Sequence, residues 1–337
     1  MFSESDKSFF SPFQISKMSV LIYIDHADGH IKKSSFEALS YGAAVAAQLN
    51  LPAQALLLGT VTDDLSTFGK YGVTIIQQVN NETLNHLDAQ VQAKVITEAV
   101  QSTGATVVVF SHNQTGKALA PRVAARLKAG LVTGAVALPD TSSGFVVKKS
   151  VFSGKAFANV NITSAVKVIS LNPNSYKIVA GDDKPATVNQ LNIAVEDSKV
   201  KVTAVNKVKG EVPLTEADIV VSGGRGLKGP ENWGIVEDLA HALHAATACS
   251  RPVADSHWRP HHEHVGQTGI QIAPNLYIAI GISGAIQHLA GVNRSKHIVV
   301  INKDPEAPFF KAADYGIVGD AFEIVPKLTE EIKKIRQ

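Results

Sequence analysis

A glycine-rich turn follows an apolar run in the last third of the 337-residue sequence. The run 218–222 leads into a turn that contains Gly224, Arg225 and Gly226, and a helical pattern begins near Glu231. Glycine lets a backbone approach a pyrophosphate closely, and the free N–H groups and dipole of a following helix favour negative charge. An arginine in the turn adds a bidentate phosphate contact. The arrangement therefore predicts a phosphate-binding site.

The same turn fits the dinucleotide fingerprint G-x-G-x-x-G. Gly224, Gly226 and Gly229 occupy its three glycine positions, and Asp255 stands somewhat beyond the place, about 20 residues on, where a ribose-binding acid is expected. Taken alone, this match is equally compatible with a tight turn that binds nothing. Residues further along the chain must decide between the two interpretations.

Small or polar clusters follow each later apolar run of the same region. In an open parallel sheet such loops gather at the carboxyl ends of the strands, where ligands bind. The candidate residues in these loops are Ser250, Arg251, Val265, Gly266, Gln267, Thr268, Gly281, Ser283, Gly284, Ala285, Gln287, His288, Asn302, Lys303 and Asp320. We expect them to line one crevice together with the glycine turn.

The chemistry of these loops suits the isoalloxazine ring of a flavin. Arg251 supplies fixed positive charge, while Gln267 and Thr268 supply neutral hydrogen bonds to ring nitrogen or carbonyl positions. His288 lies about one turn into a helix that should start after Ser283 and point its positive end into the site. Donors and cations beside a flavin raise its potential, because reduction adds negative charge. The predicted cofactor is FAD.

Two other groups of residues have competing interpretations. Four histidines in the segment 257–264 are metal-ligating side chains, but their spacing is irregular. We interpret this segment as an exposed loop and predict no metal site. Cys249 lies close to Arg251, which would favour a reactive thiolate. A small buried residue at the start of a strand is the preferred interpretation of Cys249.

The elements that must position these residues belong to an α/β protein. Short apolar runs alternate with amphipathic stretches from Val20 onward, as in strand–helix–strand units. We expect strands at 20–24, 54–58 and 106–110, and helices at 34–49 (Ser34 as N-cap), 88–101 and 115–128 (ending at Gly130). These elements predict a parallel sheet covered by helices.

The pattern changes after Ala135 to β-rich segments separated by turn residues. They lie at 145–151, 166–171, 191–195 and 200–205, and they predict an antiparallel extension. The chain then becomes polar before the α/β rhythm restarts at Ile219. The expected parts are an N-terminal extension 1–17, an N-terminal α/β domain 18–207, and a Rossmann-like parallel α/β domain 208–337 that binds FAD and ends in a helix.

Composition narrows the classes of function. A net charge of +2, with 45% hydrophobic and 18% charged residues, indicates a folded protein with little attraction for nucleic acid. Cys249 is the only cysteine, so an intrachain disulfide and a Cys-rich metal site are excluded. No run reaches the roughly 18 apolar residues of a membrane span. The segment 1–17 has acids and lacks arginine, which favours a bacterial cytoplasmic protein over one of the mitochondrial matrix.

The sequence resembles the alpha subunit of electron transfer flavoprotein. The matching motifs lie at 221–228, 250–251, 265–269, 281–291 and 301–308. They cover nearly all of the C-terminal domain, whereas the N-terminal domain is similar to the family more loosely.

The resemblance implies a heterodimer in which this subunit binds FAD and a beta subunit carries AMP. It also implies that the domain 18–207 forms the subunit interface. It implies an electron carrier without a substrate-transforming site of its own. Such a carrier accepts electrons from acyl-CoA and related dehydrogenases of fatty acid beta-oxidation and passes them to a membrane quinone oxidoreductase. It places Arg251 against the isoalloxazine, Thr268 near N5 and His288 near the C2 carbonyl. The rest of the cofactor would be held by Arg225, Ser250, Gln267, Ser283, Asn302 and Asp320.

Two alternatives come from other classes of protein. A Rossmann-type NAD-dependent oxidoreductase would need a catalytic acid or base and a substrate pocket, which the sequence does not locate. A nucleotide-binding regulatory module would need neither. Gly229 and Pro230 depart from the polar residues usual in the family at this place, so the third glycine of the fingerprint is expected to be incidental.

Overall fold

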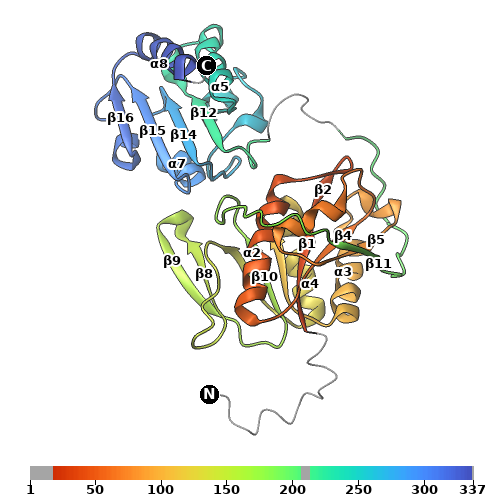
Figure 1. Cartoon of the computed structure of the whole chain (residues 1–337). Helices are drawn as coiled ribbons and strands as arrows, with labels where there is room; N and C mark the ends of the chain where they lie inside the picture. Colours follow the sequence, from red (N-terminus) through yellow and green to blue (C-terminus); the bar gives the residue numbers. More distant parts are fainter. Residues whose placement is uncertain (1–17, 206–212, 336–337) are drawn as a thin grey trace. The chain divides into compact units, whose positions relative to one another are not determined.

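A computed structural model describes residues 18–205 and 213–335 (Figure 1). Within them, one compact unit contains 18–150 and 157–205, and a second contains 151–156 and 213–335. Each unit is built around its own sheet, as expected for an α/β protein. The boundary predicted between 207 and 208 and the extension 1–17 lie outside the described residues.

The first unit contains a nine-stranded sheet with the order β11-β5-β4-β1-β6-β10-β7-β8-β9. Neighbouring strands are parallel from β11 to β7, and β8 pairs antiparallel to β7. The strands are β1 Ser19–Ile24, β4 Ala53–Leu58, β5 Ile75–Val79, β6 Ala105–Ser111, β7 Gly130–Ala135, β8 Val146–Val151, β9 Ala156–Asn161, β10 Lys167–Leu171 and β11 Thr187–Gln190. The three strands expected in the first half of the chain are confirmed.

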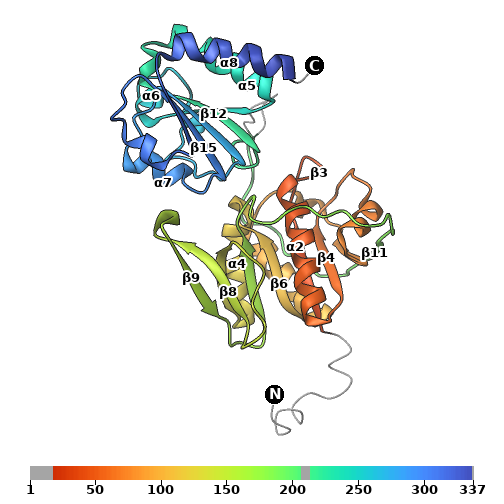
Figure 2. The ribbon, with the colours of Figure 1, turned by 60° about the vertical axis from the view of Figure 1, so that its left-hand side comes forward.

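Helices cover both faces of this sheet (Figure 2). Helix α2 (Lys33–Leu49) lies on one face, while α3 (Ala89–Thr103) and α4 (Gln114–Leu127) lie on the other. Strand β1 is buried on both sides, since Ile22 packs in the α2 core and Leu21 packs in the α3 and α4 core. Strands buried on both faces are typical of the centre of a parallel sheet. Strands β2 (His26–Ala27) and β3 (His30–Ile31) pair antiparallel as a separate two-stranded ribbon. The short 3-10 helices in this part of the chain are η2 (Leu65–Tyr71), η3 (Glu82–Asn85) and η4 (Phe152–Gly154).

Two predicted helix ends are wrong. Ser34 is not an N-cap, because α2 begins one residue earlier with Lys32 at the cap position, and the Ser34 side chain instead meets the Asn113 amide at 3.3 Å. Helix α4 ends before Gly130. Lys128 adopts a left-handed conformation (φ 53°), and its N–H donates to the carbonyls of Ala124 and Ala125. The helix is thus closed without a glycine, and Gly130 begins β7.

The predicted antiparallel extension is also wrong in part. The segment 166–171 forms β10, which lies inside the parallel sheet between β6 and β7. The segments 191–195 and 200–205 form no strand, and Thr187–Gln190 pairs with β5 instead. The alternating apolar residues of 191–195 pack as an irregular cover over the α3 and α4 core. The alternating apolar residues of 191–195 therefore predicted correctly that one side of this segment is partly buried. They did not show whether the segment pairs with another strand.

Polar side chains fill the point where the first sheet reverses its strand order. Strand β1 has β4 on one side and β6 on the other, which in a doubly wound sheet marks a ligand crevice. Here the buried Asp25 carboxylate, just after β1, accepts hydrogen bonds of 2.8 Å from Lys32 Nζ and from Asn113 Nδ2. The side chains of Lys32 and Asn113 are thus hydrogen-bonded to that of Asp25 at the carboxyl end of β1.

The second unit contains five parallel strands in the order β13-β12-β14-β15-β16. In chain order this is 2-1-3-4-5, the arrangement of flavodoxin-like doubly wound folds. The strands are β12 Ile219–Gly223, β13 Ala246–Cys249, β14 Leu276–Ile280, β15 His297–Asn302 and β16 Tyr315–Val318. The parallel α/β fold expected for this part of the chain is confirmed.

Helices α5 (Gly234–Leu243) and α8 (Ala321–Ile335) cover one face of the second sheet, and α7 (Ile286–Val292) packs on the other (Figures 1 and 2). The remaining elements are α6 (Arg251–Asp255), η5 (Arg225–Leu227), η6 (Pro230–Asn232), η7 (His261–Glu263) and η8 (Pro308–Ala312). The helix expected near Glu231 therefore begins later, after two short 3-10 turns. Among residues 18–205 and 213–335, no helix is long and apolar enough to cross a membrane.

Candidate cofactor site

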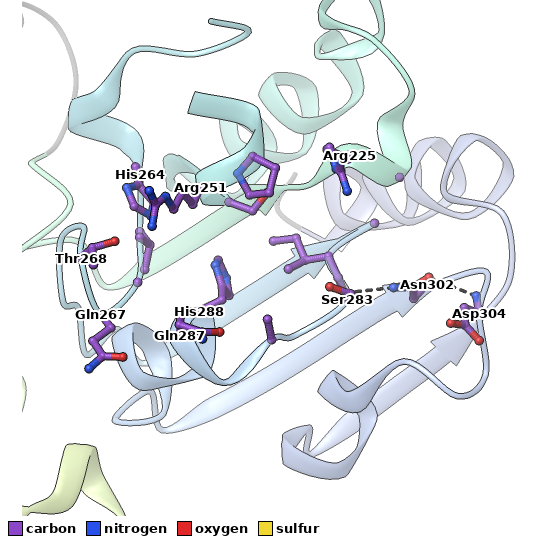
Figure 3. A pocket seen from close by; sticks show the side chains of 18 residues that line it. Arg225, Arg251, His264, Gln267, Thr268, Ser283, Gln287, His288, Asn302 and Asp304 are labelled. Carbon is purple, nitrogen blue, oxygen red and sulfur yellow. Dashed lines mark hydrogen bonds between the residues drawn. The ribbon is translucent and has the colours of Figure 1, made fainter. Parts of the chain in front are cut away.

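A cavity of about 530 Å³ opens at the carboxyl ends of the strands of the second sheet (Figure 3). This volume is within the usual range of about 300–1,000 Å³ for small-molecule sites. Loops after β12, β13, β14 and β15 all contribute to its wall. The lining residues are Arg225, Gly226, Ser250, Arg251, Pro252, His264, Val265, Gly266, Gln267, Thr268, Gly281, Ile282, Ser283, Ala285, Gln287, His288, Asn302 and Asp304.

The loops after β12 and β14 meet backbone to backbone at the switch point of the sheet. The Gly226 N–H donates to the Gly281 carbonyl at 3.0 Å, and a β-carbon on Gly226 would lie 2.7 Å from the Gly281 Cα. Gly281 itself has φ +62°, a left-handed conformation that favours glycine. A β-carbon on Gly224 would also meet the Gly281 carbonyl. The glycines are therefore needed for the close approach of two loops.

This packing changes the interpretation of the glycine turn. The N–H of Gly224 donates to the Ile280 carbonyl at 2.9 Å, so it is used inside the protein. Helix α5 begins only at Gly234, and no residue of it lines the cavity. The predicted arrangement, in which a glycine turn leads from a strand directly into the N-terminus of a helix, is therefore not present here. The group that this turn contributes to the cavity is the positively charged side chain of Arg225. Gly229 lies outside the lining, as expected for an incidental third glycine.

Arg251 reaches the cavity from the first turn of α6, whose N-cap is Ser250. Its side chain is 63% exposed, and its Nε lies 3.2 Å from Oδ2 of Asp255. Asp255 therefore balances part of the charge on Arg251. Cys249 ends β13 and does not begin it, which corrects the prediction about its place in the strand. Burial is the main factor that raises the pKa of the Cys249 thiol to about 12, so a nucleophilic role is excluded at neutral pH.

The loop 265–268 is fixed from two sides. The Val265 N–H donates to the Cys249 carbonyl at 3.1 Å, and the Gln267 N–H donates to the Gln287 carbonyl at 2.7 Å. A β-carbon on Gly291 of α7 would lie 2.5 Å from the Gly266 Cα, so helix and loop touch through their backbones. The side chains of Gln267 and Thr268 are left exposed at the cavity.

His288 is a buried wall residue of the cavity. Its Nε2 lies 2.8 Å from the Tyr277 hydroxyl, which is itself fully enclosed. Burial is the main factor that lowers the pKa of His288 to about 4, and the nearby His264 contributes to this shift. Burial likewise raises the pKa of Tyr277. At neutral pH both side chains are therefore uncharged, and the imidazole keeps one N–H donor and one acceptor nitrogen.

Asn302 ties the loops after β14 and β15 together. Its Nδ2 donates to the Ile282 carbonyl at 2.9 Å, and its Oδ1 accepts from the Asp304 N–H at 3.0 Å (Figure 3). Asp304 lines the cavity and Lys303 does not. Asp320 also lies outside the lining, because its carboxylate caps α8 by accepting from the Phe322 N–H at 2.9 Å.

The structure brings most of the predicted site residues together but leaves out four of them. Gly224 and Gly284 serve packing: Gly284 has φ +80°, and a β-carbon there would meet Phe309. Lys303 and Asp320 do not line the cavity. Sequence reasoning missed Pro252, His264, Ile282 and Asp304. Pro252, Ile282 and Asp304 are chain neighbours of predicted residues, which is the signal that would have found them.

The histidine-rich segment is not an exposed loop throughout. His257, His261 and His262 are exposed, but Glu263 and His264 are buried, with exposed fractions of 2% and 7%. A parallel bridge pairs His264 with Cys249, the last residue of β13, and His264 lies in the wall of the cavity. His264 also precedes a predicted residue, Val265, but no local signal shows that it is buried while His261 and His262 are exposed, because its burial depends on the bridge to another segment. In the described part of the chain, no group of three or more His, Cys, Asp or Glu residues is arranged to hold a metal ion.

The fold and the site together define a class of protein. A doubly wound sheet with a polar cavity at its switch point is the usual architecture of nucleotide-cofactor binding. In Figure 3, Arg251, His264, Thr268 and His288 lie toward one end of the cavity, while Arg225 and Asn302 lie toward the other. A cavity with an arginine toward each end fits a dinucleotide that has a redox-active ring.

Comparisons with known proteins identify the family. The profile described as "Electron transfer flavoprotein domain" matches residues 20–196, and the profile "Electron transfer flavoprotein FAD-binding domain" matches residues 213–293. The "Electron transfer flavoprotein subunit alpha" of Bacillus subtilis is 35% identical over 319 residues, covering 94% of this chain and 98% of its own. The mitochondrial alpha subunit of Dictyostelium discoideum is 39% identical over 297 residues, covering 82% and 80%. The chain belongs to the family of electron transfer flavoprotein alpha subunits, and its cofactor is FAD.

Proposed function

We propose that this chain forms a heterodimer with a beta subunit and acts as an electron carrier. Its FAD accepts electrons from acyl-CoA and related dehydrogenases of fatty acid beta-oxidation and passes them to a membrane quinone oxidoreductase. The main support is the cavity, in which Arg251 of α6, Thr268 of the loop 265–268 and His288 of α7 lie toward one end, although they come from three separate elements. The Bacillus and Dictyostelium relatives are named "subunit alpha", which supports a beta subunit as the partner. We place AMP in that partner.

The isoalloxazine is proposed to bind at the end of the cavity that holds Arg251, Thr268 and His288. Arg251 stabilises negative charge on the ring, the Thr268 hydroxyl bonds near N5, and His288 donates toward the C2 carbonyl. His288 is uncharged at neutral pH, so its contribution is a hydrogen bond and not a full positive charge. When bound, FAD supplies the redox chemistry, and these side chains orient it and adjust its potential.

The opposite end of the cavity is proposed to hold the nucleotide part of the cofactor. Arg225 contacts the pyrophosphate, since it is the lining residue with a fixed positive charge at this end. Asn302 and Ser283 bond to hydroxyl or phosphate oxygens. Asp304 repels phosphate and accepts hydrogen bonds from ribose hydroxyls or from the adenine amino group. Predicted roles for Lys303 and Asp320 in binding would require these residues to change position.

The absence of a substrate-transforming site is part of the proposal. Cys249 is an enclosed neutral thiol, and His288 is bonded to a buried tyrosine. Neither has the access to a substrate that a nucleophile or general base requires. A bacterial cytoplasm is the proposed compartment because of the Bacillus relative, and the mitochondrial matrix is the alternative because of the Dictyostelium relative.

Coexpression with the beta subunit tests the proposed function. The purified complex is expected to be yellow, with flavin absorption bands that bleach when an acyl-CoA dehydrogenase and its substrate are added without oxygen. Addition of a quinone oxidoreductase and quinone should restore the bands. A colourless complex that binds NAD would contradict the proposal, and a yellow complex that no dehydrogenase reduces would contradict the proposed donors alone.

A further inference from the structure

His264 is a second imidazole in the wall of the cofactor cavity, in addition to His288. The residue is 7% exposed, and its backbone is fixed by the bridge to Cys249 and by the Ile270 N–H, which donates to the His264 carbonyl at 2.8 Å. Among the described residues, no hydrogen bond is found for its ring nitrogens. The backbone of His264 is therefore fixed, and its side chain lines the cavity with ring nitrogens that are not used in hydrogen bonds to other described residues.

Charged and titratable groups surround His264 on several elements. Helix α6 contributes Arg251, which opposes protonation of the imidazole, and Asp255, which favours it. His261 in η7 also opposes protonation, and burial opposes it most strongly, so the pKa of His264 lies below its ordinary value. Helix α7 contributes His288. Figure 3 shows His264 directly beside Arg251.

Two further titratable groups lie near this ring, on β13 and on η7. Burial keeps the Cys249 thiol neutral at physiological pH. The Glu263 carboxylate, next to His264 in the chain, is paired with the Arg259 guanidinium. The loop 265–268 adds no ionisable side chain. Asp255 is therefore the negative group that acts on His264, and it is also paired with Arg251.

The two imidazoles of the cavity differ in their capacity to bind a proton. His288 is enclosed and hydrogen-bonded to Tyr277, and the pKa of His288 is about 4. His264 is less strongly desolvated and has a carboxylate in its surroundings. Because each ring disfavours charge on the other, only one of them binds a proton readily. That residue is His264.

We propose that His264 is a proton-binding residue of the cofactor pocket, neutral with the oxidised cofactor and protonated when negative charge enters the pocket on reduction. This inference rests on the proposed function. The electrons come from an external donor, which is a dehydrogenase in the cell and dithionite in the test. The proton comes from water and binds to an imidazole nitrogen of His264. No bond to the cofactor forms or breaks.

The consequence is a specific pH dependence of the reduction potential. Proton uptake on reduction makes the potential fall as pH rises, but only between the pKa of His264 in the oxidised state and its higher pKa in the reduced state. At pH values below or above this window, His264 does not contribute to the change of the reduction potential with pH. A neutral side chain at position 264 removes the contribution at every pH.

The test compares His264→Gln with His262→Gln in the FAD-loaded heterodimer. His262 is an exposed neighbour outside the cavity lining, so it is the matched control. Potentials are measured from pH 6 to pH 8.5 by stepwise reduction with dithionite. The wild-type protein and His262→Gln are expected to show a steeper fall of potential with pH than His264→Gln. Equal slopes in all three proteins would overturn the inference and leave the proposed function intact.

A measurement on the wild-type protein avoids dependence on the variant's folding. Histidine-labelled protein is titrated by NMR in the oxidised and dithionite-reduced states, with His264 assigned through its chain neighbours. The expected result is proton binding about tenfold tighter in the reduced state. Equal proton affinity in the two states rejects the inference. A preparation that binds no FAD rejects both this inference and the proposed function.

Discussion

Both carboxylate oxygens of Glu263 accept hydrogen bonds from the Arg259 guanidinium. Arg259 Nε lies 3.0 Å from Oε1 and 2.9 Å from Oε2, and Nη2 lies 2.7 Å from Oε1. Arg259 also lies over the Trp233 ring, 5.4 Å from its centroid, and bonds to Glu237 of α5 at 2.9 Å. Glu263 immediately precedes His264, so this pair connects the wall of the cofactor cavity to the α5 layer.

Replacement of Arg259 by methionine should strongly destabilise the second unit. The Glu263 side chain is 3% exposed, and loss of one partner of a buried pair costs about 3–5 kcal/mol. The control Glu237→Gln removes an exposed partner and should cost less than about 1 kcal/mol. Urea unfolding followed by tryptophan fluorescence measures both, because the two tryptophans, Trp233 and Trp258, lie in this unit. Equal losses in the two variants would show that the buried pair is not important for stability.

Substitution Gly226→Ala should separate the two loops that meet at the switch point. The added β-carbon would lie 2.7 Å from the Gly281 Cα, and backbone atoms cannot yield as a flexible side chain does. We expect a loss of about 1–3 kcal/mol and weaker FAD binding. Gly234→Ala is the matched control, since a β-carbon there meets nothing within 4 Å. FAD titration by fluorescence quenching distinguishes them, and unchanged affinity in Gly226→Ala would contradict the close-packing argument.

Loss of the Arg251 charge should change the reduction potential of the flavin but not the stability of the fold. The side chain is 63% exposed, so Arg251→Gln is expected to leave the urea midpoint unchanged. If Arg251 lies against the isoalloxazine, the reduction potential should fall by about 20–40 mV, because a cation beside developing negative charge is lost. Lys303→Gln removes an exposed cation outside the lining and serves as the control. An equal fall of the reduction potential in both variants would show that Arg251 acts only through long-range charge and does not lie against the ring.

The single cysteine reports on burial and on pH. Since burial raises the pKa of Cys249 to about 12, the thiolate fraction of the folded chain at pH 8 should be on the order of a thousandfold below that of a free thiol. Alkylation of this chain, followed by mass spectrometry, should be slow in buffer and fast in urea. Folding stability should fall as pH rises above about 9, because the unfolded thiol then ionises and the folded thiol does not. Rapid alkylation of the folded protein would contradict the burial of Cys249.

Removal of the Tyr277 hydroxyl should disturb His288. Tyr277→Phe leaves the enclosed Nε2 of His288 without its partner at 2.8 Å, at a cost of about 1–3 kcal/mol. FAD affinity should fall as well if the His288 ring contacts the cofactor. Tyr315→Phe, at a residue that is 67% exposed, is the control and should change neither property. Thermal unfolding with and without FAD separates the two effects.

Local sequence signals predicted the elements that depend on neighbours in the chain. The strands that became β1, β4 and β6 were expected within about one residue. The helix expected at 88–101 is α3, and the structure shows Asp88 at its N-cap, where its Oδ1 accepts from the Gln90 N–H at 2.9 Å. Motifs likewise identified the loops of the site, because glycine and small polar residues mark strand ends wherever they occur. The identity of the loop residues that face the cavity was less predictable, as Lys303 and Asp304 show.

The sequence by itself determined the α/β class, most of the residues that line the cavity, and the family of this protein. Only the tertiary structure decided that β10 lies inside the parallel sheet, that the second sheet has the order 2-1-3-4-5, and that His264 lies in the cavity wall. These features depend on pairings between segments that are distant in the chain. Periodicity and turn chemistry describe what a segment must bury, but the neighbour that buries it is selected by the packing of the whole fold.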